Sequence, residues 1–65
     1  MTVVYKIMLS GQGDWLKDLG NDTWKATFKI DEATSFDTHS AAMAYINENE
    51  IKFIWPQVNV QSVGV

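Results

Sequence analysis

The absence of cysteine is the feature that most limits what this chain can fold into. A domain of 65 residues buries only roughly 60% of the surface that its unfolded chain exposes, and domains of this size often need a disulfide or a structural metal. Without cysteine, neither a disulfide nor a thiolate zinc site can form. The fold therefore depends on one thin apolar core, with self-association as the remaining common support.

The composition is that of a globular chain. A hydrophobic content of 46% with a charged content of 20% distinguishes it from disordered segments, and we expect a single domain across residues 1–65. The N-terminal residues lack the basic and apolar stretches of a secretory signal, and no apolar run approaches the ~20 residues of a membrane span. These patterns predict a cytoplasmic protein with no membrane partner.

Alternation of apolar residues predicts two strands, at residues 2–10 and 24–30. Their core faces are expected to hold Val3, Tyr5, Ile7 and Leu9 in the first strand and Trp24, Ala26, Phe28 and Ile30 in the second. Residues 14–20 between them predict a short helical turn with Asp14 as its N-cap, or else a wide hairpin loop. Pro56 cannot donate to a ladder, so a third strand is expected from about residue 58.

A helix is predicted from Asp37 or Thr38, either of which can cap it, to about Asn49. The segment at residues 47–50 ends it, because asparagine suits the left-handed terminal conformation second only to glycine. Its spacing of three and four places Ala42, Tyr45, Ile46 and Asn49 on one face, and Phe36 joins the core before it. The fold class is therefore α+β, in the order ββαβ. We expect a three-stranded antiparallel sheet of order 2-1-3, with one helix on one face and the other face open.

A longer pattern joins the predicted hairpin to the helix. Ala33-x-x-Phe36-x-Thr38 followed by Ala42-x-x-Tyr45-Ile46 resembles a loose class of small phage and prophage accessory proteins, in which A-x-x-F-x-S/T-x-x-x-A-x-x-Y-I follows a β-hairpin. The chain departs from that class at Ala41, where a glutamate usually completes the capping box. The resemblance implies a phage-type protein in the host bacterial cytoplasm, and it transfers no functional residue.

No motif predicts catalysis, a cofactor or a metal site. Asp37, His39 and Ser40 are too close along one helix start to take the geometry of a hydrolase triad, and a lone His39 cannot complete a metal site. Gly11-Gln12-Gly13 is a loop hinge rather than a dinucleotide fingerprint, because Leu16 stands where the third glycine is needed. We therefore expect a protein that is not an enzyme.

The aspartates between the first two predicted strands are interpreted as loop charge. Asp14, Asp18 and Asp22 match no calcium-binding loop. Asn21-Asp22-Thr23, although it matches a glycosylation acceptor, is interpreted as a turn.

Two surfaces are left as candidates for binding. The first comprises Phe53, Ile54 and Trp55 in an extended segment, with Trp15, and it predicts an unknown protein partner or a homodimer. The second is a basic face of Lys6, Lys25 and Lys29 on the open side of the sheet, which supports the alternative of a weak nucleic-acid-binding module. Because the net charge is −3 and arginine is absent, nucleic acid is the less favoured partner.

Overall fold

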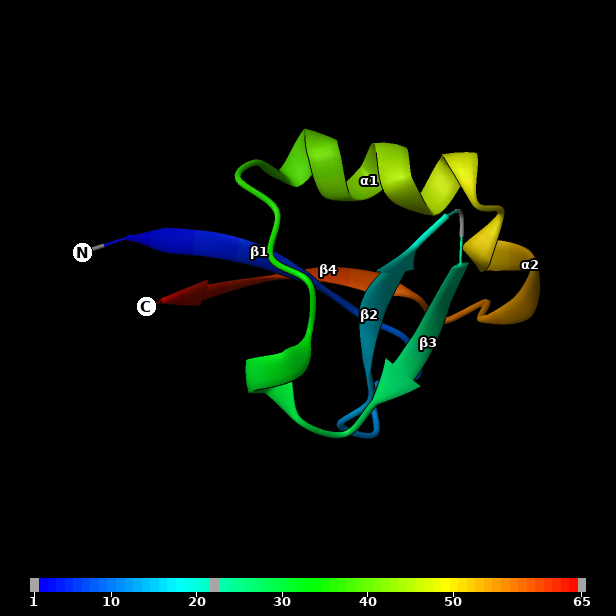
Figure 1. Ribbon diagram of the computed structural model, residues 1–65, viewed down its shortest axis with the longest axis horizontal. Coiled ribbons are helices and arrows are strands. Elements are labelled where there is room, and N and C mark those ends of the chain that lie inside the picture. Colours follow the sequence, from blue (N-terminus) through cyan, green and yellow to red (C-terminus); the bar gives the residue numbers. More distant parts are fainter. Residues whose placement is uncertain (1, 22, 65) are drawn as a thin grey trace.

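The computed structural model, which describes residues 2–21 and 23–64, has an α+β architecture with an antiparallel sheet and a helix across one face (Figure 1). The elements follow one another along the chain as β1 (Val3–Met8), β2 (Trp15–Gly20), β3 (Thr23–Thr27), η1 (Ile30–Glu32), α1 (His39–Glu48), α2 (Ile51–Ile54) and β4 (Asn59–Gly64). The α+β class predicted from the sequence is confirmed.

The sheet has four strands in the order β3-β2-β1-β4, so the predicted three-stranded sheet of order 2-1-3 is wrong. The predicted pairing of the first and last strands is confirmed, with β1 antiparallel to β4 from Val3↔Gly64 to Met8↔Asn59. The strand expected at 24–30 instead pairs with β2, which takes the place next to β1.

The additional strand, β2, lies where the sequence predicted a helical turn or a loop. It forms a hairpin with β3, in which Leu16 is opposite Ala26 and Gly20 is opposite Thr23. The turn uses left-handed backbone at Gly20 (φ 82°) and Asn21 (φ 53°), a conformation that glycine and asparagine tolerate better than other residues. The turn interpretation therefore holds for Asn21, whereas Asp22 lies outside the described residues.

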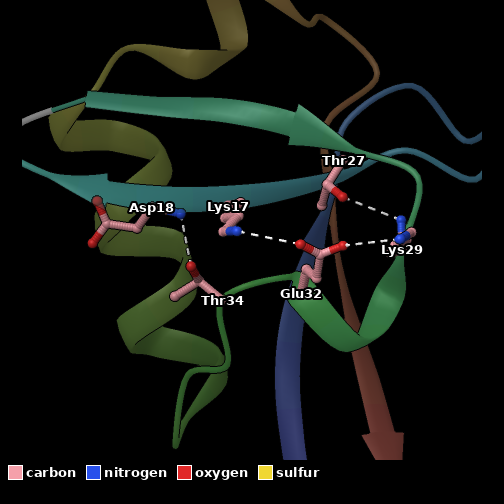
Figure 2. A network of polar contacts seen from close by, with 6 residues as sticks. All are labelled: Lys17, Asp18, Thr27, Lys29, Glu32 and Thr34. Atoms are coloured by element: carbon pink, nitrogen blue, oxygen red, sulfur yellow. Dashed lines mark hydrogen bonds and ion pairs between the residues drawn. The ribbon is translucent and has the colours of Figure 1, made fainter.

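β1 and β2 separate after a single register pair, and residues 34–36 fill the gap between them. Tyr5 and Phe36 exchange two backbone hydrogen bonds of 2.9 and 2.8 Å. On the other side, the Thr34 N–H donates to the Leu16 carbonyl at 3.1 Å, and the Asp18 N–H donates to Thr34 Oγ1 at 2.7 Å (Figure 2). The returning chain thus substitutes for a ladder that β1 and β2 do not complete.

α1 begins as predicted, because Thr38 is its N-cap and accepts a hydrogen bond of 3.0 Å from the Ala41 N–H. Ala42 and Ile46 on its inner face are buried against the sheet. The helix has 10 residues, and no helix in the described part of the chain combines the length and apolarity needed to span a bilayer.

The core lies between α1 and the middle of the sheet. Its fully or nearly fully buried members are Ile7, Leu9, Leu16, Ala42, Ile46 and Ile51, with Tyr5, Trp24, Phe36, Tyr45, Trp55, Val58 and Val60 packed around them. The predicted core residues Val3, Ala26, Phe28 and Ile30 are exposed instead. β3 is an edge strand that ends at Thr27, whereas α1 packs on β1 and β4, and Phe28 is left 81% exposed.

Candidate interaction surfaces

The segment that carries the predicted interface is a helical turn, α2, and not the extended segment expected from the sequence. The chain reverses after α1 at Glu50, which has left-handed backbone (φ 52°), whereas the sequence favoured an asparagine for this conformation. Pro56 does hold Trp55 out of the helical region (φ −124°, ψ 82°), but this constraint reaches only the residue before the proline. Ile51 is fully buried and anchors the turn.

Phe53 and Ile54 project outward from this anchored turn. Their exposed fractions are 84% and 63%, and backbone bonds to Glu50 and Ile51 hold the turn: the Phe53 N–H donates to the Glu50 carbonyl at 3.2 Å and the Trp55 N–H to the Ile51 carbonyl at 2.7 Å. Large apolar side chains exposed side by side commonly mark contact sites. We refer to Phe53 and Ile54 together as the α2 surface.

The two tryptophans of the predicted interface do not belong to the α2 surface. Trp55 is half-buried and packs against the core, so the prediction that it lies with Phe53 and Ile54 in one extended segment is wrong. Trp15 lies in β2, opposite Thr27 in the hairpin, and is half-buried. Since Leu16 faces the core, strand alternation places Trp15 on the face of the sheet away from α1.

The predicted basic face fails at Lys6. The side chain does lie on the sheet face opposite α1, but it is only 6% exposed, because residues 30–33 return across it. Its Nζ donates to the carbonyl of Ile30 at 2.6 Å and to that of Ala33 at 3.3 Å. Lys6 therefore holds the returning chain in place, and its ammonium is buried rather than exposed on the predicted basic face.

The other lysines of this face are partly neutralised by one carboxylate (Figure 2). Glu32 accepts from Lys17 Nζ at 3.4 Å and lies 3.8 Å from Lys29 Nζ. Lys25 is exposed and is the cross-strand partner of Lys17. Like charges in directly opposite positions repel, and Glu32 offsets that repulsion.

The loop between β1 and β2 closes on Asp14, which the sequence suggested as a helix cap or a solvated charge. Asp14 is only 6% exposed, and its Oδ1 accepts from the Ser10 hydroxyl at 2.6 Å and from the Ser10 N–H at 3.1 Å. The pKa of Asp14 is held below its ordinary value, chiefly by the hydroxyl bond from Ser10, although burial acts in the opposite direction. Asp14 is thus a structural residue of the loop.

Comparisons with known proteins do not indicate a function, so the functional argument rests on the surfaces of the chain itself. No protein-family model, curated protein or solved structure matches this chain. Within residues 2–21 and 23–64 there is also no pocket and no cluster of three or more histidine, aspartate or glutamate side chains that could hold a metal ion. His39 is exposed and contacts the ring of Tyr5 edge-on, with 6.1 Å between ring centroids.

The Asp14 loop leads to a prediction about acid stability. The pKa of Asp14 is lower in the folded chain than in the unfolded one, so its ionised carboxylate contributes to the free energy of unfolding. This contribution is fully present above the unfolded pKa of about 3.9 and is lost as the pH falls through the folded pKa. Asp14→Asn should therefore be less stable than the wild type at neutral pH, and the difference should shrink below about pH 4.

Urea unfolding at a series of pH values measures this difference. Ser10→Ala serves as a partner variant, because it removes the hydroxyl that contributes most to the lowered pKa of Asp14. In the Ser10→Ala background the Asp14→Asn difference should depend less on pH. If the difference in unfolding free energy between wild type and Asp14→Asn stays constant from neutral to acid pH, the Asp14 carboxylate does not have the stabilising role given to it here.

Proposed function

We propose that this chain is a non-enzymatic accessory protein that acts by protein–protein contact through the α2 surface. The observation that carries the proposal is the exposure of Phe53 and Ile54, at 84% and 63%, on a turn fixed by the fully buried Ile51. A rigid turn loses little conformational entropy when a partner binds, and aromatic side chains supply much of the energy at protein interfaces. The α2 surface is suited to insertion into an apolar groove of a partner protein.

The predicted basic face supports a nucleic-acid-binding function less well in the structure than in the sequence pattern. Lys6 is buried, and Glu32 draws Lys17 and Lys29 into ion pairs. A face with few free cations can release few counterions from a phosphate backbone, so its affinity at physiological salt would be low. Protein contact is therefore the function that we favour.

The biological setting of the proposal rests on the resemblance to phage and prophage proteins. In that setting the chain works in the host bacterial cytoplasm, where it modulates a host protein or assembles with itself. The helix start capped by Thr38 and the packing of Ala42 on the sheet reproduce the structural part of that motif. The motif does not supply the contact residues, which lie C-terminal to it in α2.

The test is capture from bacterial lysate with wild-type protein and two variants of α2. Phe53→Ser removes the most exposed aromatic group, whereas Lys52→Ser changes an exposed, polar neighbour on the same turn. Both changes should alter stability by less than about 0.5 kcal/mol, because both side chains are exposed. We expect the wild type and Lys52→Ser to retain the same partner and Phe53→Ser to lose it.

Thermal melting of each protein shows whether the variants are folded. If all three proteins retain the same partner equally, the α2 surface is not the contact. If Phe53→Ser loses the partner but has also lost its native melting transition, Ile54→Ser provides a second removal of apolar surface, since Ile54 is exposed at 63%.

A further inference from the structure

β4 forms one edge of the sheet. Among the described residues it pairs with β1 and has no strand on its other side. The backbone groups on that outer side are set by the antiparallel ladder, in which successive residues of a strand direct their N–H and C=O groups to opposite sides. The register of β1 with β4 therefore identifies which residues of β4 face outward.

Tyr5 fixes the assignment, because its N–H and C=O bond to Phe36 and so point away from β4. Its neighbours in β1 consequently bond to β4, and their register partners are Asn59, Gln61 and Val63. The intervening residues of β4, which are Val60, Ser62 and Gly64, direct their N–H and C=O groups outward. The Val60 N–H donates to Asn59 Oδ1 at 2.8 Å, as expected for a backbone donor that is not used in pairing with a neighbouring strand.

This edge lacks the features that protect strand edges against pairing. β4 is six residues long, with the sequence NVQSVG, and it contains no charged residue and no proline. β3, the opposite edge, has five residues, carries Lys25 and has a register irregularity in its hairpin with β2. Charge, shortness and bulges discourage strand addition, so β4 is the edge open to it.

We propose that β4 pairs antiparallel with β4 of a second copy of this chain across a two-fold axis, joining two sheets into one. An identical strand is a suitable partner because β4 has no charge that would oppose itself. In the register centred on Ser62, Ser62 faces Ser62 of the second copy, and Val60 faces Gly64. All three outward residues then exchange backbone hydrogen bonds, and strand addition of this kind is a common mode of recognition. The proposal does not depend on the α2 surface, which is a different element.

The experiment uses proline, which removes an N–H donor. Ser62→Pro removes an outward donor without removing any bond between β1 and β4, and edge strands tolerate proline in this orientation. Ser62→Ala is the matched control, and Ser62→Lys places like charges across the axis without altering the backbone. By sedimentation equilibrium, we expect wild type and Ser62→Ala to double in mass with concentration, and the other two variants to dimerise at least roughly tenfold more weakly.

Amide hydrogen exchange at residue 62 distinguishes this contact from one through α2. In the β4 dimer, the Ser62 N–H becomes protected as the protein concentration rises. A protein that stays monomeric at all concentrations overturns the proposal. A mass that doubles without protection of Ser62, or that still doubles in both Ser62→Pro and Ser62→Lys, also overturns it; loss of that dimer in Phe53→Ser would instead assign the contact to the α2 surface.

Discussion

Replacing Leu16 with alanine is expected to cost roughly 2–5 kcal/mol of unfolding free energy. Leu16 is fully buried in β2 and belongs to the core cluster with Ile7, Leu9 and the inner face of α1. Alanine at this position leaves a cavity in the core, in a domain too small to have much stability in reserve. Urea unfolding followed by circular dichroism should show a transition shifted far toward low urea, or no folded baseline.

Phe28→Ala is the matched control for Leu16→Ala, because it removes a larger apolar side chain from the residue that directly follows the β2–β3 hairpin. Phe28 is 81% exposed, so its loss should change the unfolding free energy by less than about 0.5 kcal/mol. The sequence prediction gives the reverse, with Phe28 in the core and Leu16 in a short helical turn or a loop outside the sheet. A large loss for Phe28→Ala together with a small one for Leu16→Ala would therefore refute the four-stranded arrangement.

The elements that sequence reasoning identified are those with a clear period. In β1, Tyr5 and Ile7 lie two residues apart on the core face, and α1 combines a capping threonine with Ala42 and Ile46 at helical spacing. Both signals are local, because the cap and the spacing act within one element. The adjacency of β1 and β4 followed from the single helix between the last two predicted strands.

β2 could not be identified in this way. Its sequence WLKDLG places Trp15 and Leu16 side by side, so apolar residues occupy both faces, and Gly20 at its end resembles a helix stop. Its strand conformation depends on pairing partners outside the segment itself, which are β3, the next strand along the chain, and Thr34, 18 residues after Leu16. A contact between Leu16 and Thr34 leaves little trace in the local sequence pattern of residues 15–20.

The candidate surfaces show the same division. Strand alternation placed Lys6 on the correct face of the sheet, but periodicity cannot show that residues 30–33 fold back over that face. For the α2 surface, the sequence indicated that some large apolar group near Trp55 would be exposed and left its identity open. The one-turn helix decides it, since Ile51 turns inward and Phe53 turns outward.

The hydrogen bonds that Lys6 donates to residues 30 and 33 lead to the second large effect on stability that we expect. Lys6→Met should lower the unfolding free energy by about 1.5–3 kcal/mol, the usual value of hydrogen bonds from a charged donor. Methionine fills a similar unbranched volume, so the loss reports the bonds from Nζ to the Ile30 and Ala33 carbonyls rather than a cavity. Urea unfolding measures the change.

Lys25→Met provides the comparison, since it makes the same chemical change at an exposed lysine of the predicted basic face and should cost less than about 0.5 kcal/mol. Hydrogen exchange adds a local readout, because the amides of Glu32 and Ala33 bond within the segment that Lys6 holds. In Lys6→Met these amides should exchange faster than the loss of global stability explains. The amides of α1 should change their exchange rates only by the amount that the global unfolding free energy predicts. If Lys6→Met and Lys25→Met behave alike in both measurements, the Lys6 ammonium does not hold the returning chain. Lys6 would then again be a candidate residue of the predicted basic face.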